Sequence, residues 1–144
     1  MKILIIGSKV RIIHLKHFSD ELEKLGMECK VILDMDFLEK SLSFNLKKRI
    51  TTNKKLKILL NTFEPNIVLL DNVSRLAKTI LDEKIPLFLL IRGNYWKELE
   101  WAKKTIYKSP LKLFSVLKNQ KLADRIFRES SMILPISEYM KNEF

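Results

Sequence analysis

Glycine and cysteine are scarce in this sequence. Only three glycines and one cysteine occur among its 144 residues. Gly7, Gly26 and Gly93 are too far apart to form a Gly-x-Gly-x-x-Gly or a Gly-x-x-x-x-Gly-Lys-Ser/Thr motif. This argues against a dinucleotide fingerprint and excludes the P-loop of nucleotide triphosphatases. The lone Cys29 lies in an apolar run, so neither a disulfide framework nor a cysteine-rich metal site can form.

Long apolar runs are also missing. The first run after the N-terminal methionine covers residues 3–6, which is too short for a signal peptide, and no stretch reaches transmembrane length. We therefore expect a cytoplasmic chain, with peripheral contact at the inner membrane face left open. The net charge is +10, which favours an anionic partner: a membrane surface, a phosphorylated substrate or a nucleic acid. Nucleic acid is the least favoured, because no binding module is recognisable.

Apolar runs and helical patterns alternate along the chain. Hydrophobic residues make up 47% and charged residues 31%, a globular composition for a single domain over residues 1–144. Buried strands are predicted at residues 3–6, 29–33, 66–70, 87–91 and 132–136. The fold class predicted is α/β: a Rossmann-like three-layer sandwich with a central parallel sheet of about five strands and helices on both faces. We expect the strand order 3-2-1-4-5.

Polar residues follow four of the predicted strands. Since the carboxyl ends of parallel strands gather at one edge of a sheet, these residues predict a cleft for a polar ligand such as a sugar or a phosphate. Any one of them is as readily an ordinary turn or cap residue. The set is Gly7, Ser8, Lys9, Asp71, Asn72, Arg92, Gly93, Asn94, Ser137 and Glu138.

Two other kinds of site are disfavoured by what is missing near the candidates. Asp71 resembles the phosphoacceptor of a receiver domain, but Gly7-Ser8-Lys9 supplies none of the further carboxylates that hold Mg²⁺ there. His14 and His17 are three residues apart without a third ligand nearby, so we expect no metal site. His14 lies near the start of a predicted helix and is kept as a cleft candidate.

A long basic helical region follows residue 95. Trp96, Trp101, Tyr107 and Phe114 are interleaved there with lysines and arginines. A basic amphipathic helix with aromatic residues can lie on an anionic bilayer. The same pattern also fits a solvated helix whose apolar side faces the core, and both interpretations stay open.

Several segments taken together resemble a known family. Residues 123–126 (Ala-Asp-Arg-Ile) and 133–141 (Ile-Leu-Pro-Ile-Ser-Glu-Tyr-Met-Lys) are similar to the run that closes the N-terminal domain of GT-B glycosyltransferases of the family-4-like group. Residues 2–6, 25–26 and 65–70 match the same domain in the same order. The resemblance spans nearly the whole chain, through motifs that are short and mostly hydrophobic.

The resemblance implies the acceptor-side domain of a retaining, nucleotide-sugar-dependent hexosyltransferase, acting on a saccharide or lipid-linked acceptor. In that family a second Rossmann-like domain holds the nucleotide-diphosphate sugar. That C-terminal domain is absent here, so the chain is expected to need it as a partner and to be inactive alone, with no cofactor of its own. The alternative is a non-enzymatic basic α/β module that docks to an anionic membrane or to a partner protein.

The sequence departs from the family at two positions. The family often has a glycine-rich loop after the first strand, where this chain has only Gly7, and a histidine after the fourth, where it has Arg92. An arginine cannot act as a general base at neutral pH, but it is suited to a phosphate or another acceptor anion. Catalytic residues are therefore left unassigned.

Overall fold

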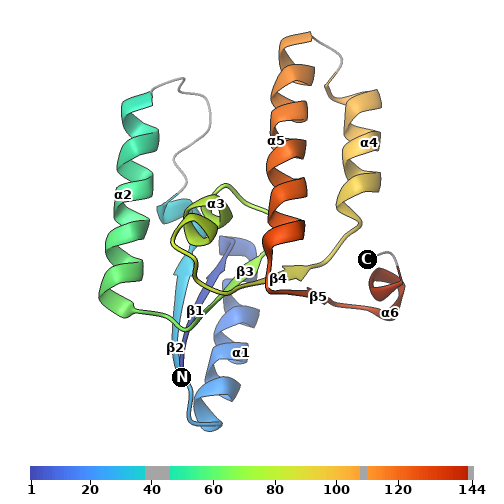
Figure 1. Ribbon diagram of the computed structural model, residues 1–144. Helices are drawn as coiled ribbons and strands as arrows, with labels where there is room; N and C mark the ends of the chain where they lie inside the picture. Colours follow the sequence, from blue (N-terminus) through green and yellow to red (C-terminus); the bar gives the residue numbers. More distant parts are fainter. Residues whose placement is uncertain (38–45, 108–109, 143–144) are drawn as a thin grey trace.

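The computed structural model describes residues 1–37, 46–107 and 110–142, and among them a sheet flanked by helices (Figure 1). The strands are β1 (Lys2–Gly7), β2 (Glu28–Leu33), β3 (Ile67–Asp71), β4 (Leu87–Ile91) and β5 (Met132–Pro135). The helices are α1 (Ile12–Lys24), α2 (Leu46–Phe63), α3 (Leu76–Asp82), α4 (Tyr95–Thr105), α5 (Pro110–Glu129) and α6 (Glu138–Lys141), with 3-10 turns η1 (Lys9–Arg11) and η2 (Asp34–Asp36).

The sheet has five strands, and every neighbouring pair is parallel. The predicted fold class is thus confirmed, but the predicted strand order is wrong: the observed order is β2-β1-β3-β4-β5. The third strand pairs with the free side of β1 instead of adding outside β2. Strand β2 therefore lies at the sheet edge, where its charged Glu28 and Lys30 are exposed to water.

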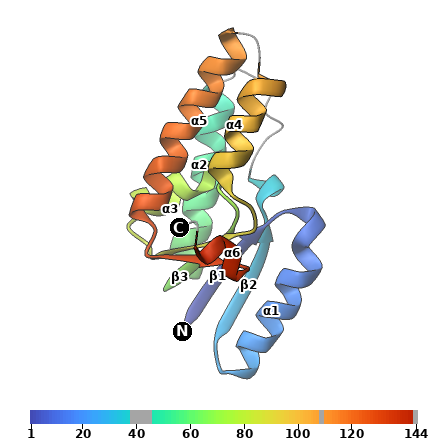
Figure 2. The ribbon, with the colours of Figure 1, turned by 90° about the vertical axis from the view of Figure 1, so that its right-hand side faces the viewer.

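The helix layers follow from this order. Because parallel crossovers are right-handed, reversing the direction of strand addition after β2 moves the later helices to the opposite face of the sheet. Among the described helices, α1 alone covers one face, where Leu15 packs with Ile3 and Ile5. Leu4 and Ile6 point to the other face, into the larger core. Figure 2 shows α1 on its own side of the sheet, away from α2, α3 and α5.

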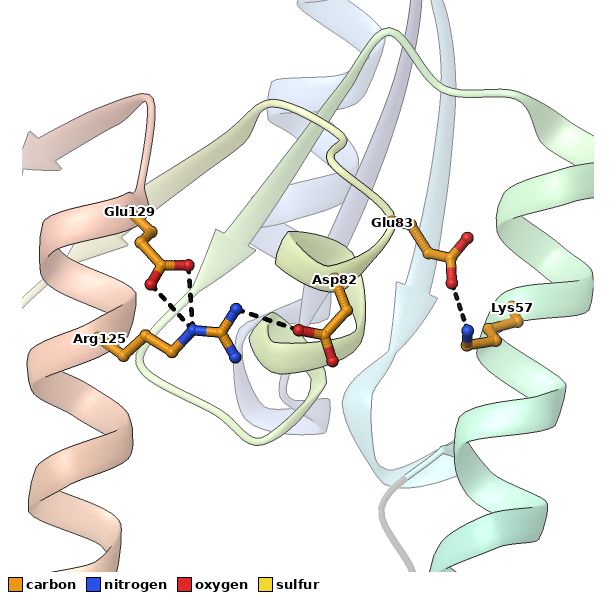
Figure 3. Close-up of polar contacts among 5 residues, drawn as sticks. All are labelled: Lys57, Asp82, Glu83, Arg125 and Glu129. Atoms are coloured by element: carbon orange, nitrogen blue, oxygen red, sulfur yellow. Dashed lines mark hydrogen bonds and ion pairs between the residues drawn. The ribbon is translucent and has the colours of Figure 1, made fainter.

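The larger core lies between the sheet and helices α2, α3 and α5. Its helical members include Leu60 from α2, Ile80 from α3 and Ile126 from α5, and Met140 of α6 joins them. Ion pairs around the end of α3 tie the three helices together at the surface (Figure 3): Arg125 bonds Asp82 and Glu129, and Lys57 bonds Glu83. These contacts fix α3 between its two longer neighbours.

Helices α4 and α5 lie side by side and extend beyond the sheet (Figures 1 and 2). At their base, Tyr95 and Trp96 pack on Phe127, with ring centroids 5.9 and 5.4 Å away. Farther along, Lys103 Nζ donates to Gln120 Oε1 at 2.8 Å. The base of this helix pair lies beside the carboxyl ends of the strands, because α4 begins directly after β4.

Candidate functional site

The point where strand order reverses lies between β1 and β3. From β1 the chain first adds β2 on one side, then β3, β4 and β5 on the other. In open parallel sheets the connections on either side of such a point run to opposite faces, which leaves a crevice at the carboxyl ends of the two strands. Gly7 ends β1 here and Asp71 ends β3. The observed strand order therefore places the crevice between β1 and β3, at the edge of the sheet where the sequence predicted a cleft.

Asp71 is the centre of this crevice. Its side chain is 0% exposed. Burying a carboxylate is costly unless cations or hydrogen-bond donors compensate its charge. Arg92 Nε donates to Asp71 Oδ1 at 2.8 Å. Arg11 Nη1 lies 3.3 Å from Oδ1 and 3.4 Å from Oδ2. Two guanidinium groups from two separate loops therefore converge on one carboxylate and leave an excess of one positive charge.

A small pocket opens beside the two arginines. Its volume is about 140 Å³, and it is lined by Arg11, Asn72, Val73, Ile91, Arg92, Gly93, Tyr95 and Glu98. This volume suits a small polar group and not a whole nucleotide sugar. Four of the predicted site residues, Asp71, Asn72, Arg92 and Gly93, are gathered at or directly behind this pocket.

The two glycines at the strand ends serve different purposes. A Cβ added to Gly7 would lie 2.1 Å from Leu15 Cδ1 and 3.4 Å from Asp71 Cβ. Gly7 is therefore required for close packing under the site. A Cβ on Gly93 would instead lie 2.1 Å from Glu98 Oε1, the tip of an exposed side chain. Gly93 leaves room in the pocket itself.

Two predicted site residues are helix caps. Asn94 Oδ1 accepts from the backbone N–H of Lys97 at 3.0 Å, at the start of α4. Ser137 Oγ accepts from Met140 N–H at 3.3 Å, at the start of α6. Both bonds satisfy first-turn donors that have no partner inside the helix.

The remaining predicted residues do not line the pocket. Ser8 is half-buried, while Lys9, His14 and Glu138 are exposed. The side chain of Glu138 pairs with Lys141 at 3.7 Å. These four lie in the loops or first helical turns where the sequence placed them, but their side chains are not brought to the arginine pair.

Arg11 is the main residue that sequence reasoning missed. It follows the end of β1 by four positions, but the 3-10 turn η1 folds the chain back so that its side chain reaches Asp71. Glu98 and Tyr95 were also missed. Both lie in the first turn of α4, and the N-cap pattern at Asn94 was the signal that this turn would face the site.

Burial raises the pKa values of two groups near the carboxyl ends of the strands. Desolvation raises the pKa of Asp34, at the end of β2; a hydrogen bond from the Met35 backbone lowers it, and the charge of Asp71 adds to the rise. Desolvation also raises the pKa of the Tyr95 hydroxyl. At neutral pH Tyr95 is therefore a neutral lining group.

The described part of the chain contains no candidate metal cluster and no candidate membrane-spanning helix. Within residues 1–37, 46–107 and 110–142, no group of three or more His, Cys, Asp or Glu side chains is arranged to hold a metal ion. Over those same residues, no helix has the length and apolar character needed to cross a membrane.

Comparison with solved structures shows a shared fold. No protein-family model and no curated protein matches the chain. A solved structure of UDP-GlcNAc 2-epimerase from Methanocaldococcus jannaschii is similar to it, with a TM-score of 0.60 and 18% identity. The match covers 99% of this chain and 41% of the epimerase chain. At this identity the likeness shows a shared fold and nothing more. This chain spans less than half of the epimerase chain's length.

Proposed function

We propose that the chain is the acceptor-side domain of a two-domain, nucleotide-sugar-dependent glycosyltransferase of the GT-B type, transferring a hexose to a saccharide or lipid-linked acceptor. In this proposal the acceptor is contacted by Asn72, Arg92 and Gly93, which line the pocket. A second domain, in the same or another polypeptide, supplies the binding site for the nucleotide-diphosphate sugar.

The single observation that carries this proposal is the Arg11–Asp71–Arg92 cluster at the β1/β3 crevice. It puts charged groups and a pocket where folds of this class bind polar ligands. Two further points support the proposal: the family-like segments span most of the chain, and the fold is shared with an enzyme whose name includes a nucleotide sugar. The pocket volume of about 140 Å³ also fits one wall of a larger cleft better than a complete active site.

The test is a binding titration of the ¹⁵N-labelled chain with a panel of saccharides and, separately, with UDP- and GDP-sugars. We expect saccharides to shift the amide signals of Asn72 and Gly93, whereas the nucleotide sugars bind weakly or not at all. A parallel assay mixes the chain with both and measures transfer, and we expect none. Sugar transfer by these 144 residues alone would contradict the two-domain proposal. Saccharide shifts confined to other surfaces would contradict the cleft assignment.

A second candidate function is docking to an anionic membrane through α4 and α5. The observation that favours it is the exposure of large apolar side chains on these helices: Trp101 is 61% exposed and Phe114 is 71% exposed. Lys104, Lys118 and Lys121 are exposed on the same pair of helices. Apolar side chains inserted among lipid headgroups, with lysines near anionic lipids, would hold the domain at the surface.

Vesicle co-sedimentation tests this second candidate. We expect binding to vesicles with anionic lipid but not to neutral ones, and loss of binding in high salt. Trp101→Ser should weaken the binding, whereas Leu25→Ser, which removes an exposed apolar side chain at the far end of α1, should not. Equal effects of the two substitutions would contradict docking through α4 and α5. Membrane docking is compatible with the transferase proposal, since a lipid-linked acceptor lies at such a surface.

A further inference from the structure

We propose that the pocket beside Arg11 and Arg92 binds a phosphate group, and that the acceptor is therefore a phosphorylated saccharide or a saccharide linked through phosphate. This rests on the proposed function, because it names the acceptor class of the same cleft. Asp71 is the positioning residue that holds the two arginines together, and the arginines contact the phosphate.

The cluster holds more positive than negative charge. Two cations surround one buried carboxylate. A single arginine would be enough to neutralise Asp71. Three apolar side chains in place of the cluster would fill the same space at similar stability. The second guanidinium is thus not explained by the needs of Asp71 alone. The cluster of Arg11, Asp71 and Arg92 therefore carries one positive charge in excess, beside a pocket that Glu98 also lines.

Both arginines keep N–H donors that Asp71 does not use. Arg92 engages Asp71 through Nε, and Arg11 through Nη1. Among the described residues no other hydrogen bond or ion pair occupies either guanidinium, and the two side chains are 28% and 31% exposed. Since both arginines line the pocket, their remaining N–H groups are available to an oxoanion that enters it. Arginine pairs favour phosphate because the planar fork matches two of its oxygens.

The surrounding backbone adds to the same preference. Arg11 directly precedes α1, and Tyr95 is the first residue of α4. Two helices of 13 and 11 residues therefore begin at this edge, and helix N-termini favour negative charge. The pocket volume of about 140 Å³ accepts a phosphate with its water, but not a nucleotide.

Among the described residues that line the pocket, Glu98 is the one exposed carboxylate. Its Oε1 lies over Gly93, at 2.1 Å from the position that a Cβ would take there. No ion pair in the described chain joins it to Arg11 or Arg92, so the arginines are not neutralised by it. The side chain is exposed and can turn to solvent when a phosphate enters. We expect Glu98→Gln to strengthen phosphate binding several-fold.

The experiment titrates the intact ¹⁵N-labelled chain with glucose 6-phosphate, inorganic phosphate, glucose and UDP, following the arginine Nε–H signals. Arg92→Lys and Arg11→Lys keep a cation for Asp71, so the fold is retained while the guanidinium fork is lost. Each should weaken binding of glucose 6-phosphate about tenfold. Arg128→Lys is the matched control, because Arg128 is an exposed arginine of α5 away from the pocket. Asp71→Asn loses the charge that holds the two guanidinium groups together, so it should weaken phosphate binding several-fold.

The outcomes separate this inference from the proposed function. Saturable binding of both phosphates, weakened in the Arg11, Arg92 and Asp71 variants only, supports it. Absence of phosphate binding, or equal weakening in Arg128→Lys, overturns it. If glucose alone shifts the cleft signals as strongly as its phosphate, the acceptor is neutral: the inference fails while the proposed function stands. If UDP binds the arginines more tightly than glucose 6-phosphate, the phosphate belongs to the donor and the acceptor inference is overturned.

Discussion

Two arginine–carboxylate clusters in the described chain use similar bonds in different surroundings. In the first, Arg125 Nε donates to Glu129 at 2.9 Å and its Nη2 donates to Asp82 at 3.0 Å (Figure 3). All three side chains reach water; those of Arg125 and Asp82 are 34% and 43% exposed. In the second, the carboxylate of Asp71 is fully buried under two arginines.

The two clusters differ in the ratio of arginines to carboxylates. At the surface, one arginine serves two carboxylates and joins α5 to α3, which leaves one negative charge in excess. At the β1/β3 crevice the count is reversed, and two arginines serve one carboxylate beside an open pocket. Surface ion pairs contribute little to stability, whereas a buried carboxylate makes the folded state depend on its partners. Of the two clusters, only the second both stabilises the fold through a buried carboxylate and keeps guanidinium N–H donors available for a ligand.

The largest expected effect comes from breaking the buried cluster. Asp71→Ala leaves two arginines without their shared acceptor and should lower the free energy of unfolding by about 2–3 kcal/mol. The loss stays below that of a completely buried pair, because both arginines reach solvent. Urea unfolding followed by circular dichroism measures it. The matched control Asp82→Ala removes an exposed carboxylate and should cost less than about 1 kcal/mol. Similar losses in the two variants would contradict the distinction drawn between the clusters.

Gly7 and Gly93, which lie at or just after the ends of β1 and β4, are expected to respond differently to the same substitution. Gly7→Ala places a methyl group against the buried Leu15 and should cost about 1–3 kcal/mol by overpacking. Gly93→Ala meets only the movable tip of Glu98 and should leave stability nearly unchanged while reducing saccharide binding. Thermal unfolding and a binding titration on both variants provide the test. A Gly93→Ala protein that loses stability as Gly7→Ala does would show that Gly93 is a packing residue as well.

A smaller effect is expected at the cap of α4. Asn94→Ala removes the bond to the Lys97 backbone and should lower stability by about 1 kcal/mol. Asn94→Asp keeps an acceptor at the N-cap and should retain most of it. If Asn94→Ala is neutral in urea unfolding but abolishes saccharide binding, then Asn94 contacts the ligand directly, as the sequence first predicted, and its cap is incidental.

The smallest effect concerns Asp34, a second aspartate at this edge that has no cationic partner among the described residues. Burial raises its pKa in the folded state, above the value of about 3.9 for an unfolded aspartate. The folded chain then binds more protons than the unfolded chain between these two pKa values, so this group's contribution to stability falls as the pH rises through that window. Asp34→Asn should therefore be slightly more stable than the parent near neutral pH and equal to it well below pH 4. A stability gain that persists unchanged in acid would contradict this cause.

Much of the fold could be predicted from the sequence, because apolar runs such as residues 87–91 are long enough to identify buried parallel strands. The strand order could not, since right-handed crossovers fix the hand of each connection but not the side on which the third strand adds. The charges of Glu28 and Lys30 were the available signal, because alternating charges fit an edge strand. The order matters for function, since it decides where the crevice lies.

The candidate site was predicted in part. Asp71, Asn72, Arg92 and Gly93 follow directly from their positions after buried strands. Arg11 was missed because its contact with Asp71 depends on how η1 turns, and that is set by packing after β1 and not by a local motif. For Asn94 and Ser137 the cap and the cleft interpretations were equally open from sequence, and the hydrogen bonds in the structure favour the cap.

We expect ligand binding at the Arg11–Asp71–Arg92 cluster and not at the surface cluster around Arg125. The most direct measurement is a crystal structure of the chain soaked with glucose 6-phosphate. We predict that the phosphate lies within hydrogen-bonding distance of the guanidinium groups of Arg11 and Arg92, with the sugar toward Asn72 and Gly93. A phosphate found instead at Arg125 and Lys57, or no ordered ligand at the β1/β3 crevice, would contradict the claim.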